Sequence, residues 1–142
     1  MRKVAIVFWS GTGNTAAMCR LVAEGISSAG AEVDVFTPTE FSPEMADQYE
    51  QLAFGCPSMG DEVLEEEEFA PMFDAVKSKL KGKKIALFGS YGWGDGEWMR
   101  IWEKDCADAG CQIILEPVIV SGPPEGDISN ACKELGRALA SA

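Results

Sequence analysis

Hydroxyl, amide and glycine residues follow one another in the run Ser10-Gly11-Thr12-Gly13-Asn14-Thr15, which Trp9 separates from the apolar residues 4–8. Successive backbone N–H groups at the start of a helix bind anions with the help of the helix dipole, and these side chains add hydrogen bonds. The run contains neither Lys nor Arg, so every donor is neutral. It also lacks the Gly-Lys-Ser/Thr ending of a triphosphate loop and the third glycine of a dinucleotide loop. It therefore favours a single phosphate group, and a glycine-rich turn without a ligand is the alternative.

A second candidate loop contains the residues Ser58-Met59-Gly60-Asp61-Glu62. The polarizable thioether of Met59 suits the face of a flat ring. Gly60 can adopt a positive φ, and Asp tolerates one better than most residues, so we expect the peptide between residues 60 and 61 to rotate at modest cost. An ordinary turn is the equally simple interpretation of this loop taken alone.

A third candidate loop has the sequence Gly89-Ser90-Tyr91-Gly92-Trp93-Gly94-Asp95-Gly96. A large aromatic residue between glycines at a strand end is poorly placed for a core and well placed to stack on a planar ligand. The alternative is a surface Trp that covers a neighbouring helix. Together the three loops predict a phosphate on one side and a flat aromatic ring between Met59 and Trp93, which describes flavin mononucleotide (FMN).

Apolar segments alternate with segments of helical periodicity along the whole chain, which indicates a parallel sheet covered by helices on both faces. We expect one domain over residues 1–142, an α/β doubly wound three-layer sandwich. The five expected strands are 3–9, 32–37, 51–55, 84–89 and 112–120, the last bent or interrupted at Pro117. Apolar residues at helical spacing lie within 18–29, 69–80, 98–109 and 128–139, and one further helical turn is expected after Pro43. Ligands of such sheets bind beyond the carboxyl ends of the strands, where the three loops fall.

The composition excludes several classes of function. The net charge of the 142 residues is −11, so nucleic acid and anionic membranes are poor partners and proteins with basic surface patches are good ones. The chain has no His, which excludes Ser-His-Asp and Cys-His catalysis and most transition-metal sites, and we expect no metal. Any chemistry must come from carboxylates, hydroxyls, the backbone, aromatic side chains or a bound cofactor, and we expect the cofactor to carry it, with no catalytic residue. The five cysteines show no Cys-x-x-Cys spacing, and we expect buried free thiols. No signal peptide or membrane span is evident, so we expect a cytoplasmic protein.

These motifs resemble those of the short-chain flavodoxins of the clostridial type, and the resemblance covers the whole chain. Ser-Gly-Thr-Gly-Asn-Thr at 10–15 is similar to their phosphate loop, and Met-Gly-Asp-Glu at 59–62 and the segment 89–96 are similar to their two flavin loops. The resemblance implies a five-stranded parallel sheet with strand order 2-1-3-4-5 and bound FMN.

The resemblance also implies roles for single residues. The phosphate would lie on residues 10–15 with help from Ser58 and Ser90, and Met59 and Trp93 would flank the ring. Glu62 would accept a hydrogen bond from the imide N–H of the ring. The backbone of Tyr91 and Gly92 would face the pyrimidine edge, and the Gly60 carbonyl would turn toward flavin N5 when the semiquinone forms.

The implied function is a low-potential one-electron carrier that uses FMN between its semiquinone and hydroquinone forms to pass electrons between redox proteins. Asp61, Glu62, Asp95 and the acidic run 61–68, with six acids in eight positions, lie near the expected ring. Each negative charge about 10 Å away in a water-like dielectric disfavours the anionic reduced ring by roughly 0.4 kcal/mol. We expect a monomer that is not an enzyme. The alternatives are an FMN-dependent quinone or nicotinamide reductase and an FMN module of a larger flavoprotein. A phospho-acceptor domain is rejected because the first strand ends without clustered acids.

Overall fold

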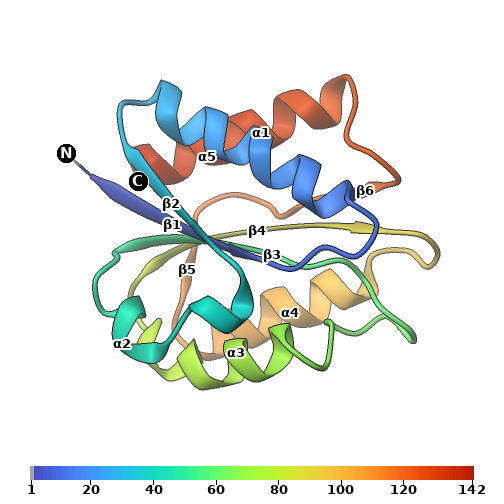
Figure 1. Cartoon of the computed structure of the whole chain (residues 1–142), viewed down its shortest axis with the longest axis horizontal. Coiled ribbons are helices and arrows are strands. Elements are labelled where there is room, and N and C mark those ends of the chain that lie inside the picture. Colours follow the sequence, from blue (N-terminus) through green and yellow to red (C-terminus); the bar gives the residue numbers. More distant parts are fainter. Residues whose placement is uncertain (1) are drawn as a thin grey trace.

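A computed structural model describes residues 2–142 as a parallel sheet between two layers of helices (Figure 1). The strand order is β2-β1-β3-β4-β5, with β6 also paired to β4, and every pair is parallel, which confirms the predicted architecture and order. The strands are β1 (Lys3–Phe8), β2 (Glu32–Phe36), β3 (Gln51–Gly55), β4 (Lys84–Tyr91), β5 (Gln112–Ile113) and β6 (Val118–Ser121). The helices are α1 (Asn14–Ser28), α2 (Pro43–Ala46), α3 (Phe69–Val76), α4 (Glu97–Asp108) and α5 (Asp127–Ser141).

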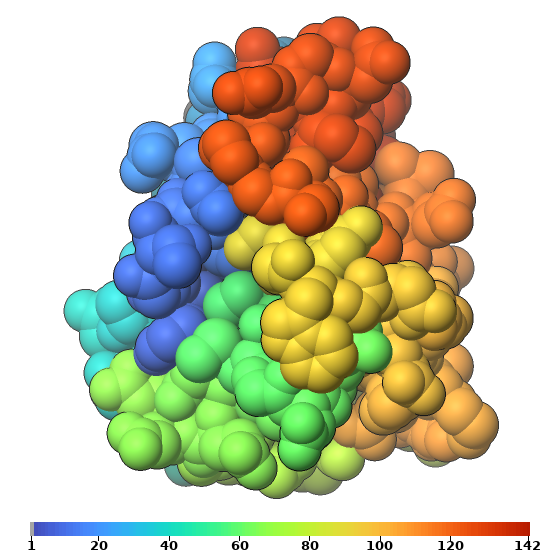
Figure 2. Space-filling model, turned by 90° about the vertical axis from the view of Figure 1, so that its right-hand side faces the viewer, coloured from blue at the N-terminus to red at the C-terminus, as the bar shows by residue number. Residues whose placement is uncertain are grey.

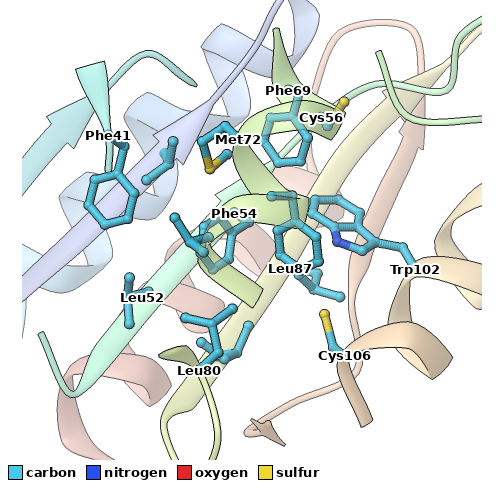
Figure 3. Packing of buried hydrophobic residues seen from close by; sticks show 14 of the residues in the cluster. Phe41, Leu52, Phe54, Cys56, Phe69, Met72, Leu80, Leu87, Trp102 and Cys106 are labelled. Carbon is cyan, nitrogen blue, oxygen red and sulfur yellow. The ribbon is translucent and has the colours of Figure 1, made fainter. Parts of the chain in front are cut away.

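Two hydrophobic clusters fill the space on either side of the sheet. In β1, Ala5 and Val7 belong to the cluster under α2, α3 and α4, whereas Val4 and Ile6 belong to the cluster under α1 and α5. This alternation follows from the two-residue repeat of a strand, and burial on both faces explains why central strands read as continuous apolar runs. The first cluster is rich in aromatic side chains and includes the buried Trp102 of α4 (Figure 3).

The fifth predicted strand is interrupted, as expected, and consists of the two short strands β5 and β6 along the same edge of β4. The fourth strand is longer than predicted, since it continues through Ser90 and Tyr91. These residues pair with Val120 and Ser121 of β6, so pairing with a distant segment extends the strand beyond the glycine at which we expected it to end. Ser90 and Tyr91 therefore lie at the end of a strand rather than in a loop.

The second long helix also differs from the prediction. The α-helical part ends at Val76, and one turn of 3-10 helix, Lys77–Lys79, completes the segment. The predicted turn of helix after Pro43 is present as α2. Across residues 2–142, no helix combines the length and the apolar character that crossing a membrane requires.

Candidate functional site

The segments that follow β1, β3, β4 and β6 meet at the carboxyl edge of the sheet and enclose a cavity of about 380 Å³. Figure 2 views this face, where the blue, green, yellow and orange-red parts of the chain come together. The cavity is lined by Trp9, Gly11, Thr12, Asn14, Pro57, Ser58, Met59, Ser90, Tyr91, Gly92, Ser121 and Gly122. The structure thus brings together members of all three predicted loops, and none of the lining residues, all within 2–142, is Lys or Arg.

Loop 10–15 is ordered by one hydroxyl group. Ser10 Oγ accepts hydrogen bonds from the backbone N–H groups of Gly13 and Ala16, each at 3.2 Å. Gly13 caps α1 with a φ of 102°, a conformation that favours glycine. The loop therefore leads directly into the N-terminus of a 15-residue helix, where the backbone N–H groups and the helix dipole favour an anion.

The hydroxyls of Thr15 and Ser90 tie this loop to β4. Their oxygens lie 2.8 Å apart, and Thr15 is 1% exposed. Thr15, predicted to bind the phosphate, is outside the cavity lining and links the start of α1 to the end of β4. Ser58 is held to the same strand, because its backbone N–H donates to the carbonyl of Ser90 at 2.9 Å.

Residues 59–63 form a tight hairpin. The backbones of Met59 and Val63 exchange two hydrogen bonds, of 2.8 and 3.0 Å. Gly60 has a φ of 49°, so the predicted positive φ is confirmed, and Glu62 has a φ of 58°, which is uncommon for a residue with a side chain. Met59 lines the cavity, whereas Gly60 and Asp61 lie on its outer side beside the acidic residues 65–67.

Glu62 links the hairpin to the third loop. Its Oε1 accepts a hydrogen bond from the backbone N–H of Glu97 at 3.1 Å, at the first turn of α4. A Cβ placed on Gly94 would lie 2.5 Å from the carboxyl carbon of Glu62, so only glycine permits this close packing. Glu62, predicted to face the ring, is outside the cavity lining and holds the two loops together.

Trp93 and Asp95 are also outside the cavity lining. Trp93 is 62% exposed and belongs to neither hydrophobic cluster. Asp95 pairs with Arg100 of α4, with 3.0 Å between Oδ1 and Nη2, on the exposed surface. The walls available to a flat ring inside the cavity are Trp9, Met59 and Tyr91.

One acid of the run 61–68 is a structural residue. Glu65 is 6% exposed, and its carboxylate accepts hydrogen bonds of 2.8 Å from the backbone N–H groups of Glu67, Glu68 and Phe69 at the start of α3. Burial raises the pKa of Glu65, but these three hydrogen bonds outweigh burial and hold the pKa below its usual value. Glu65 therefore does not belong to the solvated acidic surface.

Four lining residues were absent from the predicted site: Trp9, Pro57, Ser121 and Gly122. Ser121 ends β6 and Gly122 follows it, and the rule that selected the other three loops selects this segment too. Trp9 and Pro57 adjoin residues that were predicted.

The cavity fits FMN by the chemistry of its donors. Loop 10–15 offers hydroxyl and backbone donors to a phosphate, and the apolar walls suit a planar ring. The sequence model of the family described as "Flavodoxin" matches residues 6–136. The chain belongs to the flavodoxin family.

Two flavodoxins match over nearly their whole lengths. The flavodoxin of Clostridium beijerinckii is 44% identical over 95% of this chain and 97% of the relative, and that of Megasphaera elsdenii is 42% identical over 98% and 99%. A solution structure of two-electron reduced Megasphaera elsdenii flavodoxin superposes with a TM-score of 0.90 at 43% identity, covering 98% of this chain and 99% of that one.

These comparisons confirm the predicted family, its FMN cofactor and its function. The chain is an FMN-binding, low-potential electron carrier that exchanges electrons with redox proteins. When bound, FMN supplies the redox chemistry, and the residues of this chain bind it, orient it and set its surroundings.

Proposed function

We propose that this flavodoxin passes electrons between other proteins without turning over a substrate of its own, with FMN in the cavity at the carboxyl edge of the sheet. The observation that carries the proposal is the cavity itself, which joins a phosphate loop of neutral donors to apolar walls and opens to the surface beside the exposed Trp93. A cofactor seated there would have one edge within reach of a docked partner.

The phosphate would be bound by loop 10–15. Thr12 and Asn14 line the cavity, and Ser10 orients the backbone N–H groups of residues 13 and 16. Gly11 and Gly13 let the backbone approach closely, whereas Thr15 ties the loop to Ser90 of β4, to which Ser58 is also bonded. Because these donors are neutral, the phosphate would keep its negative charge, which makes adding an electron to a nearby ring less favourable.

The ring would lie against Met59 and Tyr91, with Gly92 at its edge and Trp93 as the outer wall. Support comes from the placement of Met59, Tyr91 and Gly92 in the cavity lining and from the exposure of Trp93. Gly60 and Asp61 form the tip of the hairpin, where a peptide rotation meets few contacts. Glu62 and Asp95 would complete the surroundings of the ring as negative charges.

A partner with a basic surface patch would dock on this end of the molecule. Four exposed large hydrophobic residues lie on the loops and helix around the cavity: Met59, Val63, Trp93 and Ile101. Beside them, a groove of about 440 Å³ between the hairpin and α4 has four acids, Glu62, Glu66, Asp105 and Asp108, and one base, Lys104, along its sides. This combination suits a partner surface with an apolar centre surrounded by Lys and Arg. We expect the carrier itself to be a monomer and to act in the cytoplasm.

A redox titration of the FMN-loaded protein, combined with turnover assays, tests the proposal. We expect two resolved one-electron steps and no oxidation of NAD(P)H in the absence of a reductase. A single concerted two-electron step would contradict the one-electron role, and rapid reduction of quinones by NAD(P)H with this protein alone would identify a reductase.

The docking surface is tested by the dependence of electron-transfer rates on ionic strength. With a reductase that carries a basic patch, we expect the second-order rate constant to fall as salt increases. Glu66→Gln should lower the rate at low salt about twofold, since one charge contributes roughly 0.4 kcal/mol. Glu24→Gln, an exposed acid of α1, is the matched control and should leave the rate unchanged. Equal effects of the two substitutions would remove the proposed surface.

A further inference from the structure

Two cysteines meet where α4 ends and β5 begins. Cys106 lies in the last turn of α4, and Cys111 directly precedes β5. The backbone N–H of Cys111 donates to the carbonyl of Cys106 at 3.0 Å, and Gly110 between them has a φ of 89°. This is the six-to-one hydrogen bond of a Schellman turn, a motif in which the side chains of the two bonded residues frequently contact each other.

The two thiols differ in access and in their readiness to lose a proton. Cys106 is buried against Trp102 in the first hydrophobic cluster (Figure 3), whereas Cys111 is partly exposed. The proximity of the two thiols lowers the pKa of Cys111 and raises that of Cys106. Asp105, next to Cys106 in the chain, opposes ionisation of both thiols, and it is bound by Lys77 with 3.1 Å between Nζ and Oδ1.

The other three cysteines, Cys19, Cys56 and Cys132, are all buried. Burial raises the pKa of the Cys19 and Cys56 thiols to about 12 and that of Cys132 to about 11. Thiol–disulfide exchange requires an accessible thiolate. Of the five cysteines, all within the described residues, Cys111 is therefore the one suited to attack, and Cys106 is the thiol at the other end of the same turn.

We propose that Cys106 and Cys111 form a thiol–disulfide exchange pair that reduces low-molecular-weight disulfides. The Cys111 thiolate attacks one sulfur of the disulfide RSSR, which breaks the S–S bond, releases RS⁻ and leaves a mixed disulfide on Cys111. Cys106 then loses its proton and attacks the Cys111 sulfur, releasing the second RS⁻. The two thiols are oxidised by two electrons to one protein disulfide, and RSSR is reduced to two RSH after protonation.

This pair is separate from the cofactor site. Gln112, next to Cys111, pairs with Lys84, the first residue of β4, whereas the cavity lies at the other end of that strand, around Ser90 and Tyr91. The exchange therefore requires no electron from the cofactor, and its test does not depend on the proposed function. A Cys106–Cys111 disulfide would covalently fix the end of α4 to the start of β5.

The test uses the folded, FMN-loaded protein with excess 5,5′-dithiobis(2-nitrobenzoate) as the disulfide. We expect two equivalents of thionitrobenzoate per chain, the second released at a rate independent of reagent concentration, and a peptide map with a disulfide between residues 106 and 111. One equivalent with a stable mixed disulfide at Cys111, no release, or release of more than two equivalents would each overturn the proposal.

Variants separate the two steps. Cys106→Ala should release one equivalent and keep the mixed disulfide on Cys111, and Cys111→Ser should slow release by at least tenfold. Cys132→Ala, which removes a buried thiol elsewhere, should still release two equivalents. Because Cys106 is buried, its substitution can impair folding. In that case the peptide map of the unaltered protein alone tests the proposal. A disulfide between any other two cysteines, or no disulfide, overturns it.

Discussion

Loop 10–15 and the hairpin 59–63 both follow a buried strand at the carboxyl edge of the sheet, and they keep their conformations by different means. In loop 10–15 a neutral hydroxyl, that of Ser10, accepts two backbone N–H groups at the start of α1. Around the hairpin, carboxylates are the acceptors. Glu62 accepts a hydrogen bond from a backbone N–H in the first turn of α4, and Glu65 accepts hydrogen bonds from three backbone N–H groups at the start of α3.

Because loop 10–15 uses a hydroxyl and the hairpin region uses carboxylates, the negative charge lies on the hairpin side of the site. A carboxylate at the start of α1 would repel an incoming phosphate, whereas a neutral acceptor there adds no negative charge to oppose an anion at the helix N-terminus. On the side proposed for the ring, carboxylates order the loops and would add negative charge to the surroundings of the cofactor. We expect substitutions in loop 10–15 to act on the phosphate and substitutions around the hairpin to act on the ring or on stability.

Ser10→Ala should produce the largest effect. The variant loses the acceptor for the N–H groups of Gly13 and Ala16, and the loop loses its order before FMN binds. Two hydrogen bonds correspond to about 2 kcal/mol, or roughly a 30-fold loss of FMN affinity. Titration of the apoprotein followed by flavin fluorescence measures this. Riboflavin, which lacks the phosphate, is the control ligand and should bind with unchanged affinity; an equal loss for both ligands would contradict a phosphate-specific role.

Glu65→Gln should lower the free energy of unfolding by about 1.5 kcal/mol near neutral pH, because a charged acceptor of three hydrogen bonds becomes a neutral one. Chemical denaturation measures the loss. Glu66→Gln, an exposed neighbour, is the matched control and should change stability by less than 0.5 kcal/mol, a typical limit for surface substitutions.

The effect of Glu65 should depend on pH in one direction. Its pKa is lower in the folded protein than its ordinary value of 4.5, so the carboxylate stabilises the fold fully above that pH and loses its contribution as the pH falls through the folded pKa. The stability difference between Glu65→Gln and the unaltered protein should therefore be constant above about pH 5 and shrink below it. A difference that grows in acid would contradict the capping role.

Local sequence patterns predicted most of the fold because each strand carries its own signal. Continuous apolar runs fixed the centres of β1 and β3, and the predicted bounds of β3 match those observed. The extension of β4 through Ser90 and Tyr91 was missed because it depends on pairing with β6, some 30 residues away in sequence, and not on the polar and aromatic residues themselves. The order of the strands came from the family resemblance.

The site was predicted loop by loop, and the sequence does not show which way several of its side chains face. Six acids in the run 61–68 look alike in the sequence, yet Glu65 turns inward because α3 starts beside it with free N–H groups. In the same way Glu62 meets the start of α4 and Thr15 meets Ser90. Each of these contacts joins segments that only the tertiary fold brings together, except the cap at Glu65, which depends on where the helix begins.

Trp93→Ala should produce the smallest of these effects and distinguishes the ring side of the site from the phosphate side. If Trp93 rests on the outer face of the ring, losing it should weaken FMN binding by about 1.4 kcal/mol, or roughly tenfold. Riboflavin affinity should fall by the same factor, in contrast to Ser10→Ala, because both ligands carry the ring. Ile101→Ala is the matched control, since Ile101 is 60% exposed on α4 and lies outside the cavity lining, and it should leave both affinities unchanged. A tenfold loss for FMN alone would place Trp93 on the phosphate side, and no loss for either ligand would leave Trp9, Met59 and Tyr91 as the walls that hold the ring.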